Sequence, residues 1–149
     1  MTYALGLQLT QEHGYALAVA ASSALLLQYL AAKAGSLRKK ADVPYPYMYA
    51  ERSVAEKNPI ANKHNCYQRA HQNTLEAYPV FLVLFTITAI KYPLIASGAG
   101  ATWIAGRIAY AQGYYTGNPA QRQRGVFGYL GLLTLLGASV KTCFDLIMY

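Results

Sequence analysis

Long uncharged runs separated by short polar segments dominate the hydrophobic pattern of this chain. Residues 14–32 form nineteen consecutive positions without a charge. Two further runs, 94–115 and 126–148, carry no charge except Arg107 in the first and Lys141 and Asp145 in the second. Because about 20 helical residues cross the hydrocarbon core of a bilayer, each run predicts a membrane-spanning helix.

One more span is predicted between the first and the third, over residues 70–90. Only 77–90 is uncharged there, which is too short for a bilayer, so the helix must extend back into polar sequence. A signal peptide is the competing interpretation of the first run, but Glu12 and the lack of Lys or Arg before the run disfavour it. The pattern therefore predicts one all-α integral membrane domain over residues 1–149, built as a bundle of four transmembrane helices.

The composition of the chain indicates which kinds of binding partner to expect. Hydrophobic residues make up 54% of the 149 positions and charged residues 13%, against about 25% charged in soluble domains. Thirteen Lys and Arg against six Asp and Glu give a net charge of +7, which suits an anionic membrane surface or an anionic small molecule. Nucleic acid is not expected as a partner of so apolar a chain. Cys66 and Cys143 lie far apart in the sequence, and no disulfide or metal site is predicted.

The basic residues concentrate in two of the connections between spans. Residues 33–69 hold eight of the thirteen, and the connection before the fourth span holds Arg122 and Arg124. The positive-inside rule places both connections in the cytosol and both termini on the lumenal or exterior side. Prolines at 44, 46 and 59 predict an irregular loop in the first connection, with His64 at its surface.

Polar side chains recur on one face of two predicted spans, near their cytosolic ends. The two sets, each at helical spacing, are Arg69, Asn73 and Glu76 in the second span and Arg107, Tyr110 and Tyr114 in the third. An ionisable group in a membrane is costly unless it is paired or lines a cavity, so both sets indicate a functional site. In the alternative interpretation, the arginines only extend to the lipid headgroups and Glu76 pairs with one of them.

The balance of charges favours a binding pocket over that alternative. Six cations converge on one side of the membrane near a single acid, Glu76; they are Arg38, Lys39, Arg69, Arg107, Arg122 and Arg124. This set predicts a site for a polyanionic molecule that also has one ammonium group. For His71, near the same interface, a ligand contact and a structural role are equally open.

A stripe of small side chains follows the other face of the third span. Its members are Ala101, Ala105, Ala109, Gly113 and Gly117. Such a stripe lets another helix approach closely. Packing inside the four-helix unit and a contact between subunits both fit this pattern.

Two long motifs resemble the superfamily of membrane-associated proteins in eicosanoid and glutathione metabolism (MAPEG). They are NCYQRAHQNTLEAYP at 65–79 and GRIAYAQGYYTGNP at 106–119, and LRKK at 37–40 with YPYMY at 45–49 extends the similarity. The type 3 branch of the microsomal glutathione S-transferases is the most similar. The resemblance implies a homotrimer of left-handed four-helix bundles, with the cosubstrate glutathione bound between neighbouring subunits near the cytosolic face.

The resemblance also implies a role for each candidate residue. The implied glutathione contacts are Arg38 and His71 near the glycine carboxylate, Arg69, Asn73, Glu76 and Tyr110 at the γ-glutamyl end, and Arg107 and Tyr114 along the same pocket. Arg122, with Arg124 as its rival, would stabilise the glutathione thiolate. Ala77 departs from the leukotriene-forming members of the superfamily, which carry a tyrosine there.

The activity implied is that of a glutathione-dependent membrane enzyme without a metal. Such an enzyme conjugates glutathione to lipophilic electrophiles, reduces lipid hydroperoxides, or does both. The conjugation reactions implied include one like that of leukotriene C synthase. The implied location is the endoplasmic reticulum membrane, with the mitochondrial outer membrane as the second choice. A non-catalytic lipid-binding scaffold of the lipoxygenase-activating type is the alternative. A small channel or transporter is disfavoured because the polar residues occupy only one half of the membrane.

Overall fold

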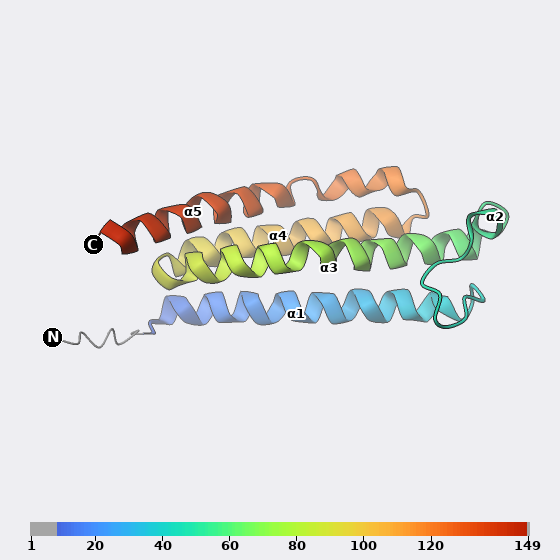
Figure 1. The fold of residues 1–149 in the computed structure, drawn as a ribbon, viewed down its shortest axis with the longest axis horizontal. Helices are drawn as coiled ribbons and strands as arrows, with labels where there is room; N and C mark the ends of the chain where they lie inside the picture. The colour runs from blue at the N-terminus through green and yellow to red at the C-terminus, as the bar shows by residue number, and fades with distance from the viewer. Residues whose placement is uncertain (1–8, 149) are drawn as a thin grey trace.

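Four long helices lie side by side in the computed structural model, which describes residues 9–148 (Figure 1). They are α1 (Gln11–Arg38), α3 (Pro59–Lys91), α4 (Pro93–Tyr115) and α5 (Gly128–Met148). Two short elements lie in the connections, the one-turn helix α2 (Arg52–Ala55) and the 3-10 helix η1 (Pro119–Gly125). Within residues 9–148 there is no strand, so the prediction of an all-α fold is confirmed.

Three of these helices, α1, α3 and α5, are long and apolar enough to cross a membrane. Their outer faces carry large apolar side chains that are exposed, such as Leu25, Val83 and Ile147. A monomeric soluble protein rarely exposes apolar surface of this extent, whereas a bilayer covers it. Of the long helices described, α4, which carries Arg107, falls outside this group of three.

The ends of the helices show which predicted boundaries were wrong. The third and fourth predicted spans agree with α4 and α5 to within two residues. By contrast, α3 begins at Pro59 and not at residue 70. The side chain of Asn58 accepts hydrogen bonds from the backbone N–H groups of Ile60 and Ala61, and a proline at the first helical position loses no hydrogen bond. Pro59 therefore starts a helix where the sequence analysis placed an irregular loop.

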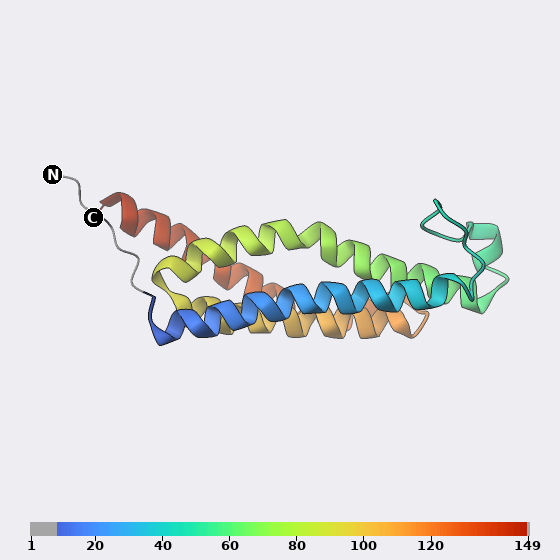
Figure 2. The same ribbon diagram turned by 90° about the horizontal axis from the view of Figure 1, so that it is seen from below.

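The arrangement of the bundle brings the two basic connections together. The beginning of α1 and the end of α5 lie at one end, and the connections 39–58 and 116–118 lie at the other (Figure 1). The view turned by 90° shows the longer connection gathered where α1 ends and α3 begins (Figure 2). The cations of the connection 39–58 therefore lie at the same end as the turn 116–118, which leads into η1 with Arg122 and Arg124.

The connection 39–58 is attached to the helices and covers His64. This histidine is fully buried, and its Nε2 lies 3.2 Å from the carbonyl oxygen of Met48. The side chain of Asn65 accepts from the N–H of Ala50 at 2.8 Å and donates to the carbonyl of the same residue at 2.9 Å. The expectation that His64 is a surface residue was wrong, because α3 begins earlier and the connection folds over it.

Glycines bring the backbones of α4, η1 and α5 into direct contact. A Cβ atom added to Gly106 would lie 2.4 Å from the Cα of Gly128, and one added to Gly113 would lie 2.1 Å from the carbonyl oxygen of Gln121. No larger residue fits at either position without moving a backbone. This contact places the start of α5 directly beside Arg107.

Part of the predicted stripe of small residues packs inside the bundle, because Gly113 contacts η1. Ala101 and Ala105 lie on the exposed side of α4, whereas Gly106 and Gly113 are buried. Packing inside the four-helix unit is therefore wrong for Ala101 and Ala105. A contact between subunits stays a prediction.

Candidate functional site

Arg107 is the buried cation around which the site is built. Only 9% of the residue is exposed, and its Nη2 donates to Asn73 Oδ1 at 2.9 Å and to Thr74 Oγ1 at 2.7 Å. Its Nε also donates to Thr74 Oγ1, at 3.1 Å, and its guanidinium carbon lies 4.1 Å from the centre of the Tyr110 ring. The interpretation in which Arg107 extends to the lipid headgroups is therefore wrong.

Helix α3 determines the position of this guanidinium through Thr74. The Thr74 side chain is fully buried and donates its hydroxyl hydrogen to the carbonyl of Ala70 at 2.8 Å. Its oxygen lone pairs are thus left for Arg107. Because a buried charge is costly unless it is compensated, and neither Asn73 nor Thr74 carries a negative charge, the site favours an anionic ligand.

Arg69 and Glu76 form an ion pair on the outer face of α3. Arg69 Nη1 lies 3.0 Å from Glu76 Oε1, and the two side chains are 41% and 48% exposed. Exposed pairs of this kind contribute about 1 kcal/mol or less to stability, so a ligand can separate them at low cost. Of the two arginines considered from the sequence, the one that pairs with Glu76 is Arg69.

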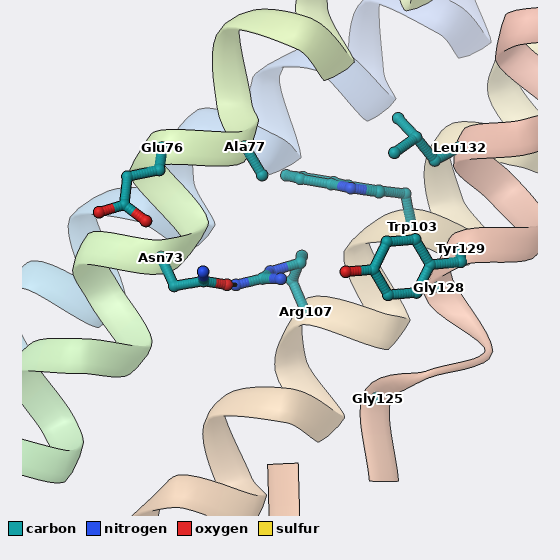
Figure 3. A pocket seen from close by; sticks show the side chains of 9 residues that line it. All are labelled: Asn73, Glu76, Ala77, Trp103, Arg107, Gly125, Gly128, Tyr129 and Leu132. Atoms are coloured by element: carbon teal, nitrogen blue, oxygen red, sulfur yellow. Dashed lines mark hydrogen bonds between the residues drawn. The ribbon is translucent and has the colours of Figure 1, made fainter. Parts of the chain in front are cut away.

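A pocket of about 280 Å³ lies between α3, α4 and the start of α5 (Figure 3). Its lining consists of Asn73, Glu76, Ala77, Trp103, Arg107, Gly125, Gly128, Tyr129 and Leu132. Arg107 and Asn73 form a polar side, and Trp103 and Leu132 form an apolar side. The ring of Trp103 is held by Phe81, which stacks on it with the ring centres 4.0 Å apart. The pocket therefore offers a cation and an apolar wall to the same ligand.

The side chains in the pocket point in distinct directions. Figure 3 shows the side chains of Arg107 and Asn73 meeting inside it, and the hydroxyl of Tyr129 pointing from α5 toward Arg107. The carboxylate of Glu76 points away from Arg107. Three of the residues expected from the sequence, Asn73, Glu76 and Arg107, are thus brought together in one pocket.

Tyr110 and Tyr114 continue the site along α4. Their ring centres are 5.1 Å apart, and Tyr110 lies against the guanidinium of Arg107. Tyr49, from the connection 39–58, reaches the edge of this region, where its hydroxyl donates to the side chain of Gln72. Burial raises the pKa of the Tyr49 phenol above its usual value, and the nearby Arg69 partly opposes this shift. Tyr49 is therefore a neutral donor at physiological pH.

Arg38 and His71 do not join the pocket of this chain. Arg38 donates hydrogen bonds to the carbonyls of Val43 and Tyr47, and its guanidinium carbon lies 4.7 Å from the centre of the Tyr45 ring. His71 precedes Asn73 by two positions, which places their side chains about 160° apart around an α-helix. Neither residue is among those that line the pocket.

Arg122 and Arg124 both lie on η1 with exposed side chains. Arg122 Nη1 donates to the carbonyl of Pro119 at 2.9 Å. In a helix with three residues per turn, positions two apart point about 120° away from each other, so the two guanidinium groups leave η1 in different directions. The pocket reaches the neighbouring Gly125. The choice between the two arginines stays a prediction.

The sequence analysis missed Thr74, Trp103, Tyr129 and Leu132 as residues of the site. Thr74 follows Asn73 directly but lies about 100° further around α3, so it escaped the search for a single polar face. A signal for Tyr129 was present, because Gly125, Gly128 and Gly131 recur every three residues. These glycines form the side of η1 and α5 that packs against α4, and Tyr129 directly follows one of them, Gly128.

A family model described as the MAPEG family matches residues 16–144. The matched range extends from α1 into α5 and includes every residue that lines the pocket.

Proposed function

This chain belongs to the MAPEG family, and we propose that it is a glutathione-dependent membrane enzyme that conjugates lipophilic electrophiles or reduces lipid hydroperoxides. The family includes glutathione-dependent transferases and peroxidases as well as members without enzymatic activity. One observation carries the proposal for this chain. The buried Arg107, which has only neutral partners among its hydrogen bonds, shares a pocket with Asn73, Glu76 and an apolar wall.

Glutathione fits the charges of this site. The tripeptide has two carboxylates, one ammonium group and a thiol. Arg69 and Arg107 supply cations for the γ-glutamyl carboxylate, and Glu76 supplies the acid for the ammonium group. Asn73 and Tyr110 offer neutral hydrogen bonds beside them, and Tyr114 continues the same wall.

A second copy of the chain would complete the site. The pocket of about 280 Å³ lies near the lower limit of about 300 Å³ for ligand sites, so one chain holds only part of the tripeptide. Arg38 and His71 do not line it. In a homotrimer of four-span bundles, these two residues of a neighbouring subunit would meet the glycine carboxylate.

The chemistry requires a thiolate near neutral pH beside a lipid-soluble electrophile. A free thiol has a pKa of about 8.5, and a neighbouring guanidinium in a partly dehydrated site favours the anion. A decrease of one to two pKa units corresponds to about 1.4 to 2.7 kcal/mol, which one well-placed arginine can supply. We assign this role to Arg122, with Arg124 as the rival. No metal is needed for the step.

The proposed setting is a cytosol-facing site in the endoplasmic reticulum membrane. The end of the bundle that carries both basic connections would face the cytosol, as the positive-inside rule requires. The lipophilic substrate would enter from the bilayer along the apolar wall. Within the family, the type 3 microsomal glutathione S-transferases are the branch that we expect to be nearest.

Turnover measurements test this function. Detergent-purified protein should consume glutathione with 1-chloro-2,4-dinitrobenzene or with cumene hydroperoxide, and the rate should saturate with glutathione. Saturable glutathione binding without turnover of any electrophile would contradict catalysis. Lipid binding without glutathione binding would support the non-catalytic scaffold instead.

A further inference from the structure

Tyr129 places a phenolic hydroxyl at the mouth of the pocket. It is the second residue of α5, and the hydroxyl points into the pocket toward Arg107 (Figure 3). The residue as a whole is 62% exposed, on a helix that is apolar enough to cross a membrane. The phenol therefore lies where a lipophilic molecule passes from the bilayer into the pocket.

The contact between two glycines fixes the backbone at Tyr129 relative to the backbone at Arg107. Gly106 and Gly128 touch through their backbones, and the residues that directly follow them are Arg107 and Tyr129. Neither helix can move away from the other without losing this contact. The guanidinium and the phenol thus extend into the same pocket from two backbones that are held together.

Tyr129 also differs chemically from the other residues of the pocket. Among the nine residues in the lining, it is the one with a hydroxyl group. Asn73 is engaged by Arg107, and the carboxylate of Glu76 points away. On the apolar side, next to Trp103 and Leu132, the Tyr129 phenol is the group that can release a proton.

We propose that Tyr129 is the catalytic acid that protonates the oxygen leaving group of the electrophile. This inference rests on the proposed function. Among the electrophiles of the proposed function, this role applies to those in which an O–O or C–O bond breaks, such as hydroperoxides and epoxides.

The proposed step balances for both kinds of substrate. With a hydroperoxide, a bond forms between the thiolate sulfur of glutathione and the terminal oxygen, the O–O bond breaks, and its electron pair stays on the inner oxygen. That oxygen takes the proton of Tyr129 and leaves as an alcohol, so the peroxide is reduced and the sulfur is oxidised to a sulfenic acid. A second glutathione thiol converts the sulfenic acid to the disulfide and water. With an epoxide, a C–S bond forms, the C–O bond breaks, and the ring oxygen takes the same proton.

Arg107 assists the acid without reacting. After the transfer, Tyr129 is a phenolate that faces the guanidinium, which stabilises the negative charge until a proton returns from water. A phenol is a stronger acid than an aliphatic alcohol, so the transfer of its proton to an alkoxide is favourable. General acids in enzymes accelerate such steps by about 10²- to 10⁴-fold.

The test is the variant Tyr129→Phe in the full-length protein, assayed with two electrophiles. Cumene hydroperoxide has an oxygen leaving group that needs a proton, whereas 1-chloro-2,4-dinitrobenzene loses chloride, which needs none. We expect kcat/KM for the hydroperoxide to fall about a hundredfold and kcat/KM for the aryl chloride to stay unchanged. Glutathione affinity, measured by calorimetry, should also stay unchanged, which shows that the variant is folded.

Tyr29→Phe is the matched control, because it removes a hydroxyl from an exposed tyrosine on α1 outside the pocket. It should leave both activities as they are. An equal loss with both electrophiles for Tyr129→Phe, no loss with either, or a wild type that is active only on the aryl chloride would overturn the role of Tyr129. A wild type that is inactive with both would overturn the proposed function as well.

Discussion

At the scale of single residues, the affinity of the site for an anionic ligand depends on which charged side chains already have a partner of opposite charge. Glu76 is paired with Arg69, whereas the hydrogen bonds of Arg107 go to neutral side chains. The bundle thus keeps one buried cation for the ligand and one exposed ion pair that a ligand can open.

The proposed contact of Glu76 with glutathione can be tested separately from its ion pair with Arg69. We expect Glu76→Gln to weaken glutathione binding about tenfold to a hundredfold, because a hydrogen bond to a charged group contributes about 1.5 to 3 kcal/mol. The measurement is calorimetry on the assembled protein.

Glu56→Gln is the control for this substitution, since Glu56 also pairs with an arginine, Arg52, at 2.7 Å but lies at the end of α2, outside the pocket. It should leave the affinity unchanged. If Glu76→Gln binds glutathione as well as the wild type, Glu76 does not face the ammonium group.

Substituting each of the two arginines of η1 should have a different effect on the pH at which the bound glutathione thiolate forms. In the wild type, the ultraviolet absorbance of bound thiolate should appear well below the pKa of about 8.5 of a free thiol. Arg122→Ala should move this transition close to that of the free thiol and lose most turnover while glutathione still binds. Arg124→Ala should retain the low transition. The reverse result would exchange the two roles, and no change in either variant would assign the thiolate to another cation.

At the scale of elements, the contact of α4 with η1 and α5 shapes the pocket. Gly106→Ala should displace α5, because the new Cβ would lie 2.4 Å from the Cα of Gly128. Overpacking of this kind costs about 1 to 3 kcal/mol, which thermal unfolding in detergent would detect as a lower midpoint. Both activities should fall with it, since Arg107 and Tyr129 follow the two glycines.

Gly98→Ala on the same helix is the control for this variant, because nothing lies within 4 Å of a Cβ there. It should be neutral or stabilise α4 by up to about 1 kcal/mol, the difference in helix propensity between the two residues. Equal stability of Gly106→Ala and Gly98→Ala would show that the glycine contact does not hold α5 in place.

Helix type and order could be predicted from the sequence, because long apolar runs have few alternatives in a chain of this composition. The start of α3 could not be predicted, since a proline such as Pro59 occurs both in loops and at the first position of a helix. In the structure, the side chain of Asn58 caps the helix and fixes its start at Pro59. The polar faces of α3 and α4 were also predictable from helical spacing. The surroundings of Arg107 were not predictable, because Thr74 and Tyr129 come close to it only through the packing of three helices.

At the scale of the whole molecule, several residues implied in one site face different sides of a single chain. Arg38 and His71 lie away from the pocket, and Ala101 and Ala105 form an exposed strip along α4. We therefore expect a trimer in mild detergent by native mass measurement. Arg38→Ala should lower glutathione affinity although this residue does not line the pocket of its own chain. A protein that is monomeric at high concentration would contradict a site shared between subunits.

A glutathione site built around Arg107 can be tested by titrating glutathione into detergent-purified protein by calorimetry, with the wild type and Arg107→Gln in parallel. The wild type should show saturable binding near neutral pH. Arg107→Gln, which removes the buried cation, should bind about tenfold to a hundredfold more weakly, as expected for the loss of a charged hydrogen bond. The absence of saturable binding by a correctly assembled wild type, or equal affinity of the two proteins, would contradict a glutathione site built around Arg107.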